Sequence, residues 1–512
     1  MPEPHVVVVG AGVAGLACAA ELAHQGMHVT LCESAAAVGG KMRTLEVDGA
    51  AIDAGPTVMT MRWVFDGLFA RCGQRLDNAV TLEPLAVLAR HFWSDGSALD
   101  LFADRQASQD AVARFAGAAE GRRFAAFCRT ATQVYQALEE PYIRAPAPSM
   151  AQLTQALGWQ GLSTLTRIGP MRSLMSSLQR QLQHPKLQQL FGRYATYCGS
   201  SPWHAPATLM LIADVEMQGV WAVQGGMGAL AQALATLAQS QGAELRCGTA
   251  VERIELSAGR VSGVILQDGS HLRADAVVFN GDPNALRERL LGEAVQGAVA
   301  ATPPPRSLSA VTWAVHTATA GVAMDRHNVF FDDDYASEFD AIFGAGRLPP
   351  KPTVYLCAQD RGVGRDPATE QAERMLVLVN APARGDSSDW QEEDWHQCET
   401  HTMRLLQRCG LRWQPQPHHM LRSTPVTFHQ RFAASGGALY GQATHGWMAA
   451  FARPGAQSMV PGLYLAGGSV HPGPGVPMAA LSGHQAAVAV MANRALTKRF
   501  HPAATSGGTL TH

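Results

Sequence analysis

The stretch Val6–Glu33, VVVVGAGVAGLACAAELAHQGMHVTLCE, decides the fold of this chain. Its four successive valines predict a strand that is buried on both faces, as in a parallel sheet. The strand leads into Gly10-Ala11-Gly12-Val13-Ala14-Gly15, then into an alanine-rich helix and a second strand that ends at Glu33. The order of strand, glycine loop, helix, strand and acid predicts a dinucleotide-binding unit rather than a plain glycine-rich turn.

The three glycines of this loop are predicted to have separate roles. Gly10 allows a tight turn, Gly12 leaves room for a pyrophosphate, and Gly15 lets the helix pack closely on the strand. The helix N-terminus at Val13 and Ala14 offers free N–H groups to the phosphates. Glu33, followed by Ser34, comes close to the ~20-residue spacing at which an acid binds a ribose hydroxyl.

Length, composition and charge exclude several classes of protein. The chain has 512 residues, enough for two or three domains, with 16% charged residues and a net charge of −2. Because no general basic field is present, we expect no nucleic-acid partner. Nine cysteines without a CxxC pair favour a reducing compartment, and we expect neither a disulfide framework nor a metal site.

The same sequence shows how the chain relates to membranes. No uninterrupted apolar run approaches the ~18 residues that span a bilayer. The first strand begins at Val6, which leaves no room for a signal peptide ahead of it. We therefore expect a protein that is cytosolic or rests on a membrane without crossing it.

A second glycine-rich loop follows the first unit. Gly39-Gly40-Lys41-Met42-Arg43 suits a backbone loop near phosphate, with Lys41 or Arg43 available for charge. These cations could instead be solvated loop charges, but their position directly after the dinucleotide unit favours the cofactor role. Gly55-Pro56-Thr57 then turns the chain toward the far end of the cofactor.

The dinucleotide-binding domain is predicted to be discontinuous. Ala276–Phe279, which ends at Asn280-Gly281-Asp282, has the pattern of a strand that returns to the first sheet. Near the end of the chain, the strand Leu463–Ala466 and the turn His471–Pro477 precede a helix that starts at about Met478. We expect one cofactor whose two ends are held by the two ends of the chain, in a domain made of residues 1–84, 223–296 and 455–497.

The remaining segments build other parts of an α/β protein. Residues 85–222 are predicted to form a helix-rich insert, 297–454 a mixed-sheet substrate domain and 498–512 a flexible tail. Within the insert, apolar residues at helical spacing form one stripe with few basic neighbours, which favours a core face over a membrane face. The members of this stripe are Met171, Leu174, Met175, Leu178 and Leu182.

Taken together, these motifs resemble the flavin-dependent amine oxidase superfamily and, within it, the bacterial carotenoid desaturases. The motifs that carry the resemblance are Gly10–Gly15 with Glu33, Gly39–Arg43, Asp53–Thr57, Gly225–Leu230 and His471–Pro477. More closely, Gly55–Ala70 (GPTVMTMRWVFDGLFA) and Ser97–Asp104 (SALDLFAD) are similar to the 1-hydroxycarotenoid 3,4-desaturases, or methoxyneurosporene dehydrogenases, of purple photosynthetic bacteria. The resemblance implies a Rossmann-type FAD-binding domain.

The resemblance also implies a role for each cofactor residue. The first loop would approach the FAD pyrophosphate, Glu33 the adenosine ribose and Val251 the adenine. The second loop would line the middle of the cofactor, and Gly55-Pro56-Thr57 the flavin ring. Gly468 and the start of the last helix would meet the ribityl chain and the pyrimidine side of the ring. The implied set is Gly10, Gly12, Val13, Ala14, Gly15, Glu33, Ser34, Gly39, Gly40, Lys41, Arg43, Gly55, Pro56, Thr57, Val251, Asp282, Gly468, Val476, Pro477 and Met478.

The implied activity is the introduction of a C-3,4 double bond into an acyclic 1-hydroxycarotenoid, by hydride transfer to flavin. The electron acceptor would be oxygen or a quinone. The substrate would dissolve in the bilayer, so we expect peripheral membrane association on the cytoplasmic side, through a patch and tunnel mouth on the helix-rich insert. No catalytic residue is named: His471 is either a proton acceptor or a turn histidine packed against the flavin.

Three alternatives remain open. A phytoene-type desaturase would share the chemistry but act repeatedly on the carotenoid backbone. An amine oxidase would need a lysine near the flavin, for which Lys351 is the candidate. Gly468-Ser469 stands where amine oxidases commonly carry an acid after the glycine, which argues against that alternative. A non-catalytic flavoprotein or carotenoid carrier is the third.

Overall fold

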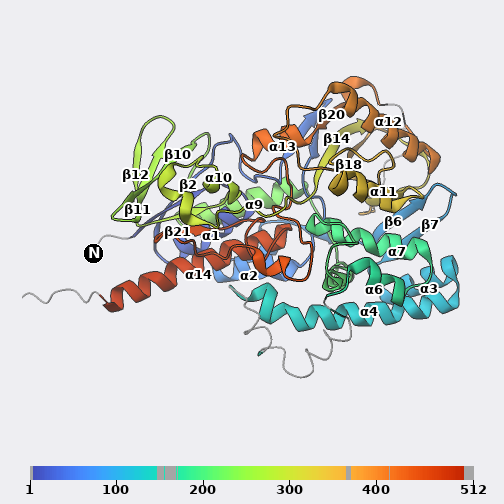
Figure 1. Cartoon of the computed structure of the whole chain (residues 1–512), viewed down its shortest axis with the longest axis horizontal. Coiled ribbons are helices and arrows are strands. Elements are labelled where there is room, and N and C mark those ends of the chain that lie inside the picture. Colours follow the sequence, from blue (N-terminus) through green and yellow to red (C-terminus); the bar gives the residue numbers. More distant parts are fainter. Residues whose placement is uncertain are drawn as a thin grey trace, which may run out of the picture.

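The structure is a computed structural model, and it describes residues 4–146, 155, 169, 171–364, 371–413 and 415–500. Two lobes lie side by side along the long axis of the molecule (Figure 1). The first lobe carries the N-terminal strand and the last helix, and the second carries a large sheet and a group of helices. Of the predicted tail at 498–512, the first three residues belong to the last helix, and 501–512 lie outside the described residues.

The first lobe is built on a parallel sheet with the strand order β21-β13-β1-β2-β9, counted within the described residues. All neighbouring strands run parallel. Val7 and Val8 in the central strand have no accessible surface, as the unbroken valine run predicts. The strands are β1 (His5–Val9), β2 (His28–Cys32), β9 (Glu244–Arg246), β13 (Ala276–Phe279) and β21 (Leu463–Leu465). This sheet, made from distant segments, confirms the predicted Rossmann-type α/β class.

Helix α1 (Val13–His24) lies between α9 (Met227–Ser240) and α14 (Val476–Phe500). Every residue of α1 from Val13 to Ala23 is buried, because helices pack on it from two sides while the sheet covers another. A Cβ added at Gly483 of α14 would stand 2.2 Å from the Ala14 carbonyl oxygen, so α14 touches the first turn of α1. The two ends of the chain therefore meet at the glycine loop.

Smaller elements complete the first lobe. The strands β10, β11 and β12 form an antiparallel sheet within the described residues, and β3 pairs with β4. Their bounds, with those of the neighbouring helices, are β3 (Thr44–Val47), β4 (Ala50–Asp53), α2 (Arg62–Arg71), β10 (Val251–Ser257), β11 (Arg260–Leu266), β12 (His271–Arg273) and α10 (Asn284–Arg287). The 3-10 helices here are η1 (Leu76–Asn78) and η5 (Glu293–Ala298).

The second lobe contains a mixed sheet with the order β20-β14-β18-β17-β16-β6-β7, again within the described part of the chain. Its strands pair antiparallel except β16 with β6, which confirms the predicted mixed sheet. The bounds are β6 (Val87–Trp93), β7 (Ala98–Phe102), β14 (Ser309–Thr317), β16 (His327–Phe331), β17 (Val354–Ala358), β18 (Glu373–Ala381) and β20 (Met420–Ser423).

The strands β6 and β7 fall in the segment that the sequence pattern assigns to the helix-rich insert. In the structure they extend the sheet of the second lobe instead. Phe92 stacks on Phe330 with ring centroids 4.8 Å apart, and Trp93 stacks on Phe331 at 5.4 Å. These cross-strand aromatic pairs connect parts of the chain that are far apart in sequence, so local patterning does not show them.

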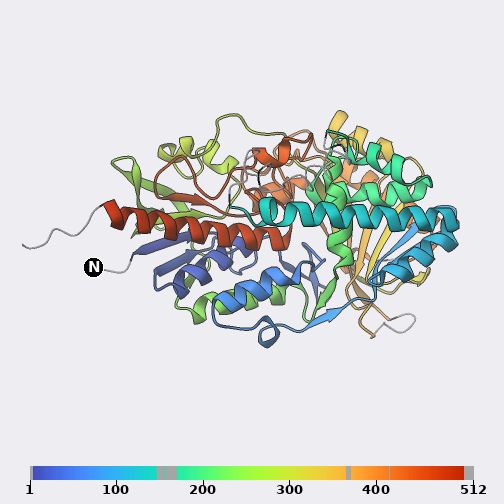
Figure 2. The same ribbon diagram turned by 90° about the horizontal axis from the view of Figure 1, so that it is seen from below.

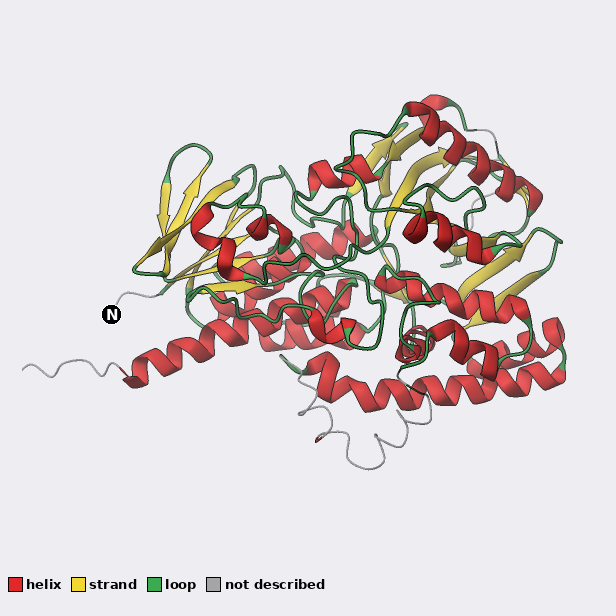
Figure 3. Cartoon of the chain, in the orientation of Figure 1, coloured by secondary structure: helices red, strands yellow, loops and turns green. Residues whose placement is uncertain are grey.

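The helices of the insert cover one side of the second lobe (Figure 3). The predicted stripe is buried at Leu174, Met175, Leu178 and Leu182, whereas Met171 is 80% exposed. The expected core face is therefore confirmed from Leu174 onward. The helices are α3 (Arg105–Ala116), α4 (Ala118–Leu138), α6 (Leu174–Gln181), α7 (Pro185–Gly192) and α8 (Leu211–Met217), with η3 (Arg193–Cys198) and η4 (Ala207–Met210). In Figure 2, α4 and α14 both run along the length of the molecule.

The remaining elements are short or peripheral. Among the described residues, no helix is both long and apolar enough to span a bilayer. The bounds are β5 (Leu82–Pro84), η2 (Glu139–Arg144), β8 (Trp221–Val223), β15 (Ala320–Gly321), α11 (Tyr335–Phe339), η6 (Asp340–Gly344), α12 (Glu392–Arg408), β19 (Leu411–Arg412), η7 (Pro417–His419), α13 (Pro425–Arg431) and η8 (Ala449–Ala452).

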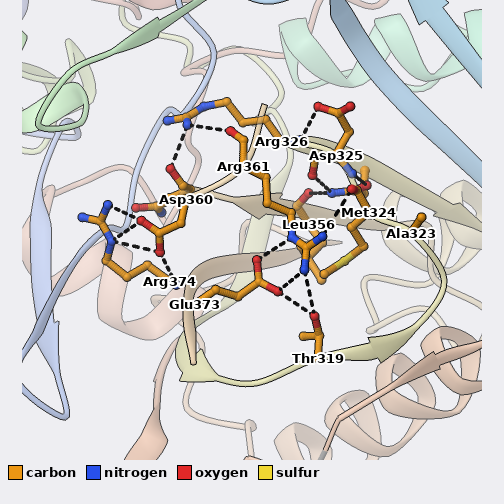
Figure 4. A network of polar contacts seen from close by, with 12 residues as sticks. Thr319, Ala323, Met324, Asp325, Arg326, Leu356, Asp360, Arg361, Glu373 and Arg374 are labelled. Atoms are coloured by element: carbon orange, nitrogen blue, oxygen red, sulfur yellow. Dashed lines mark hydrogen bonds and ion pairs between the residues drawn. The ribbon is translucent and has the colours of Figure 1, made fainter. Parts of the chain in front are cut away.

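A polar network joins the large sheet to the first lobe (Figure 4). The buried carboxylate of Glu373 binds the Arg361 guanidinium at 2.7 Å, and Arg374 pairs with Asp360. Arg374 also donates from Nη1 to the Ala51 carbonyl oxygen of β4 at 3.2 Å. The network therefore fixes the beginning of β18 against the β3–β4 hairpin, which leads directly into the predicted cofactor turn.

Candidate cofactor and substrate site

A cavity of about 960 Å³ lies between the two lobes. Its lining comes from both ends of the chain, from the large sheet and from the insert. All the predicted cofactor residues except Gly15 line it. They are Gly10, Gly12, Val13, Ala14, Glu33, Ser34, Gly39, Gly40, Lys41, Arg43, Gly55, Pro56, Thr57, Val251, Asp282, Gly468, Val476, Pro477 and Met478.

Close packing explains the glycines of the first loop. A Cβ at Gly15 would stand 2.1 Å from the Gly10 carbonyl oxygen, and one at Gly12 would stand 2.9 Å from Asn280 Nδ2. Gly10 has a φ of +102°, which favours glycine. Asn280 Nδ2 donates to the Gly10 carbonyl oxygen at 3.0 Å and holds the loop against the end of β13. Gly15 thus packs the helix on the loop and does not face the cavity.

The carboxylate of Glu33 is buried beside this loop. Its Oε2 accepts a hydrogen bond from Ala11 N at 2.7 Å, and its Oε1 accepts one from Ala35 N at 2.8 Å. Gly39 N in turn donates to the Ala11 carbonyl oxygen at 2.9 Å, so both glycine loops lie against each other. Ser34 Oγ also donates to Oε1 at 3.3 Å, whereas Oε2 accepts one bond and can therefore accept a ribose hydroxyl as well.

The two cations of the second loop have different environments. Lys41 Nζ donates to the Leu439 carbonyl oxygen at 2.7 Å, and burial lowers the pKa of its ammonium group. Arg43 Nη2 donates to Ser423 Oγ at 3.2 Å, and its guanidinium lies over the Phe428 ring. Burial lowers the pKa of Arg43 to about 10. Arg43 Nη1 is buried without a hydrogen-bond partner in the described chain, and this donor suits an acceptor-rich ligand.

The C-terminal turn lies beside the end of β13. Ser469 Oγ donates to Asp282 Oδ2 at 2.9 Å, and Arg453 donates to the Gly468 carbonyl oxygen at 3.3 Å. Helix α14 begins at Val476, two residues before the predicted start at Met478. The first N–H groups of a helix have no partner within it and carry partial positive charge. The cavity therefore meets the positive end of α14.

The turn Gly55-Pro56-Thr57 connects the cavity to the large sheet. A Cβ at Gly55 would stand 1.8 Å from the Lys41 carbonyl oxygen, so this turn packs on the second glycine loop. Thr57 Oγ1 and Tyr355 Oη are 2.7 Å apart, and His327 Nδ1 is also 2.7 Å from that Tyr355 oxygen. The turn therefore marks the point where the cofactor residues meet the second lobe.

These features fit an FAD molecule. The glycine cradle leaves no room for side chains, Glu33 offers acceptors, Arg43 has an unpaired donor, and α14 presents a helix N-terminus. The glycine cradle suits the pyrophosphate, Glu33 suits a ribose, and the α14 N-terminus suits an electron-rich ring. The unpaired Arg43 donor suits any of the acceptor groups of the dinucleotide. The individual contacts with FAD stay predictions.

The structure gives other tasks to three groups that the sequence singles out. The loop Gly225–Leu230 does not line the cavity; its Met227 N donates to Asp53 Oδ2 at 2.6 Å. His471 is not among the cavity-lining residues either. Its Nε2 lies 2.8 Å from the Ala145 carbonyl oxygen, its ring packs edge-on against Tyr142, and burial lowers its pKa to about 4. Lys351 is half exposed and pairs with Asp334.

Several residues that line the cavity are not predicted from the sequence. For Asn280 a signal exists, since it directly follows a predicted strand of the first sheet. The others have no such signal. A polar group of Arg193, Tyr197, Glu216 and Tyr355 also lines the cavity. These residues come from the insert and the large sheet, and only the tertiary structure brings them together.

A family model described as flavin containing amine oxidoreductase matches residues 13–491. The hydroxyneurosporene desaturase of Rubrivivax gelatinosus is 53% identical over 99% of this chain and 98% of its own length. That of Cereibacter sphaeroides is 46% identical over 97% of this chain and 99% of its own length.

Two solved structures share the fold at low sequence identity. A putrescine oxidase with bound putrescine has a TM-score of 0.57 and 13% identity, covering 96% of this chain and 99% of its own. The cyclohexylamine oxidase of Brevibacterium oxydans has a TM-score of 0.57 and 16% identity, covering 96% of this chain and all of its own. At these identities the likeness establishes the architecture alone.

Proposed function

The chain belongs to the family of flavin-containing amine oxidoreductases, and from this premise we propose that it is an FAD-dependent desaturase of acyclic 1-hydroxycarotenoids. It introduces the C-3,4 double bond into a substrate of the hydroxyneurosporene type. The proposal agrees with relatives named hydroxyneurosporene desaturase that are 43–53% identical over nearly the whole chain.

One observation carries this proposal: the cofactor residues and a largely apolar chamber belong to the same cavity. The same cavity is also lined by Leu209, Leu211, Ile212, Val215 and Leu376. An apolar lining lets a hydrocarbon chain lie against the flavin end while water is excluded.

The residues of the chain have binding and orienting tasks in this reaction. Bound FAD supplies a two-electron acceptor for the hydride removed from the allylic carbon of the substrate. The existing polyene spreads the positive charge that develops, and the neighbouring carbon then releases a proton, which ends in the solvent, to complete the double bond. The protein mainly orients the chain and keeps water away from the hydride transfer. The N-terminus of α14 would stabilise negative charge on the pyrimidine side of the bound ring. The terminal electron acceptor is oxygen or a quinone.

We also propose that the protein lies peripherally on the cytoplasmic side of a membrane. Trp447 lines the cavity and is 39% exposed, and the neighbouring Met448 is 44% exposed. Phe451 in the same segment lines the cavity too. Apolar surface of this kind beside a substrate cavity suits contact with a bilayer. This support comes from 447–451 rather than from the helix-rich insert, where a membrane-facing patch is expected from sequence.

Sedimentation with vesicles of phosphatidylcholine and phosphatidylglycerol tests the membrane proposal. We expect the wild type to sediment with vesicles at low and high salt, and a Trp447→Ser, Met448→Ser double variant to sediment less. A wild type that stays in the supernatant at both salt concentrations would contradict it.

Anaerobic mixing of the FAD-loaded enzyme with candidate substrates tests the activity. We expect a 1-hydroxycarotenoid to bleach the visible flavin absorbance and to yield a product with one added double bond and a red-shifted spectrum. Repeated desaturation of the unmodified backbone would support a phytoene-type enzyme, and peroxide formation from simple amines would support an oxidase. Bound FAD that no carotenoid bleaches would indicate a carrier.

A further inference from the structure

A cluster of three polar residues, Arg193, Tyr197 and Glu216, lies in the apolar chamber and has no role in the proposed reaction as described above. Arg193 and Tyr197 belong to η3, and Glu216 belongs to α8; all three line the cavity. Arg193 Nη1 donates to Tyr197 Oη at 3.1 Å, and Tyr197 Oη donates to Glu216 Oε1 at 2.7 Å. Tyr194 Oη donates to Glu216 Oε2 at 2.5 Å from the other side.

Like Arg43, Arg193 has unused donors, whereas two other cavity-lining cations, Lys41 and Arg453, donate to backbone carbonyl oxygens. Lys41 donates to the Leu439 carbonyl oxygen, and Arg453 donates to three backbone carbonyl oxygens. Within the described residues, Arg193 makes one side-chain hydrogen bond and has no carboxylate within ion-pair distance. A guanidinium has five N–H donors, so most of them remain available to a ligand in the cavity.

Two aromatic rings hold the Arg193 guanidinium in place. Its central carbon lies 5.2 Å from the ring centroid of Tyr197 and 5.2 Å from that of Tyr355. Burial is the largest single effect and lowers the pKa of Arg193, but Tyr197, Glu216 and Tyr355 together raise the pKa overall. The side chain therefore stays charged and oriented, which costs less entropy on binding than a mobile arginine would.

Direct contacts connect this group to the turn that is predicted to approach the flavin ring. Tyr355, which packs on Arg193, shares a 2.7 Å hydrogen bond with Thr57. Thr57 belongs to the turn that is predicted to approach the flavin ring. A chain of direct contacts thus leads from the expected position of the flavin to Arg193, Tyr197 and Glu216.

We propose that Arg193, with Tyr197 and Glu216, binds a hydroxyl group at the end of an otherwise apolar substrate and thereby selects hydroxylated over unhydroxylated carotenoids. The inference rests on the proposed function. A hydroxyl both accepts and donates hydrogen bonds. Its oxygen accepts one from an N–H of Arg193, and its O–H donates one to a Glu216 oxygen. An analogue without the hydroxyl would cover these groups and leave them unpaired, and such sites discriminate strongly.

The position of the hydroxyl would also determine which bond reacts. In a 1-hydroxycarotenoid the hydroxyl carbon C1 is separated from C3 by a single methylene carbon. Anchoring the hydroxyl beside the turn of Thr57 therefore brings C3 and C4 to the flavin end of the cavity. Arg193, Tyr197 and Glu216 act here as positioning residues, because they hold the substrate and do not take part in bond breaking.

Substrate pairs that differ only in the hydroxyl test this proposal. We expect Arg193→Met to lower kcat/KM for the 1-hydroxycarotenoid by about 10- to 100-fold. Its kcat/KM for the same carotenoid without the hydroxyl should stay within about 3-fold of the wild type, so the discrimination is lost. Arg193→Lys should restore part of it. Arg123→Met, at an arginine whose side chain is 45% exposed and lies outside the cavity, is the control and should discriminate like the wild type.

Binding to the oxidised, FAD-loaded enzyme separates this inference from the proposed function. Dissociation constants for the two carotenoids, measured by fluorescence quenching, should differ in the wild type and converge in Arg193→Met. If the wild type turns over neither carotenoid, the proposed reaction fails, while the dissociation constants still decide the role of Arg193. If Arg193→Met does not fold, Tyr197→Phe tests the same prediction, and its loss of discrimination should be smaller. A folded, FAD-loaded Arg193→Met that discriminates like the wild type would overturn the inference.

Discussion

Asp53 and Met227 lie 174 positions apart in the chain, and Asp53 Oδ2 accepts a hydrogen bond from Met227 N at 2.6 Å. Asp53 Oδ1 accepts a second bond from Gly228 N at 3.3 Å. Burial raises the pKa of Asp53, and these two N–H groups oppose that shift. The carboxylate thus caps α9 and joins the β3–β4 hairpin to the first lobe.

Removing this cap should weaken the fold. We expect Asp53→Ala to lower the free energy of unfolding by about 1–2 kcal/mol, because the first N–H groups of α9 lose their acceptor. Urea unfolding monitored by circular dichroism measures the change. Asp66→Ala, which removes a partly exposed i,i+4 ion pair with Arg62, should cost less than about 1 kcal/mol. Equal losses in both variants would contradict the capping role.

The glycine cradle should tolerate no side chain at its helix–loop contact. Gly15→Ala places a methyl group 2.1 Å from the Gly10 carbonyl oxygen, so the loop has to move and FAD should be lost. The flavin-to-protein absorbance ratio after purification measures this loss. Gly297→Ala meets no atom within 4 Å and should keep its flavin. A Gly15→Ala protein that retains FAD would refute the packing role.

The apolar stripe of the insert offers a matched pair of truncations. Leu178 is fully buried, whereas Met171 at the start of the stripe is 80% exposed. Leu178→Ala should lower the free energy of unfolding by about 2–5 kcal/mol through the cavity that it creates. Met171→Ala should change it by no more than about 0.5 kcal/mol. Urea unfolding compares the two, and similar effects would contradict the burial pattern.

Replacing Lys351, the lysine that an amine oxidase would need, discriminates between a desaturase and an amine oxidase. Lys351 pairs with Asp334 outside the cavity, so Lys351→Met should leave both flavin content and the rate of anaerobic flavin bleaching unchanged. Lys41→Met leaves the Leu439 carbonyl oxygen without its donor and should cost about 1–3 kcal/mol of stability. Loss of flavin reduction in Lys351→Met with normal FAD content would support the lysine-dependent alternative.

Burial of His327 should make the protein sensitive to mild acid. Its side chain is 2% exposed, and burial lowers its pKa from 6.5 to about 3. Between these values the unfolded state binds the additional proton, so stability is complete above pH 6.5 and falls as the pH decreases toward 3. At pH 5 this histidine should cost about 2 kcal/mol relative to pH 7.

Urea unfolding of the wild type and His327→Gln at several pH values measures this contribution. The variant lacks the titrating group, so its unfolding free energy should depend less on pH between 6.5 and 5. The difference between the two proteins isolates His327 from other titrating groups. An identical pH dependence in both would show that the buried imidazole is not responsible.

Much of the fold could be predicted because the relevant signals are local. The valine run, the spacing of Gly10, Gly12 and Gly15, and the stripe from Leu174 to Leu182 each reflect the geometry of a single strand, loop or helix. The residues of β6 and β7 could not be placed in the same way. The partners of β6, Phe330 and Phe331, lie far along the chain. The sequence pattern of a strand does not indicate which sheet the strand joins.

The sequence by itself determined the α/β class, the dinucleotide loop and its acid, and the membership of both chain ends in one cofactor domain. It did so because glycine spacing and hydrophobic period follow from backbone geometry. Only the tertiary structure decided that Asp53 caps α9, that His471 contacts the Ala145 carbonyl oxygen instead of lining the cavity, and that Arg193, Tyr197 and Glu216 meet in an apolar chamber. Those outcomes depend on which distant side chains pack together, and no local pattern encodes that choice.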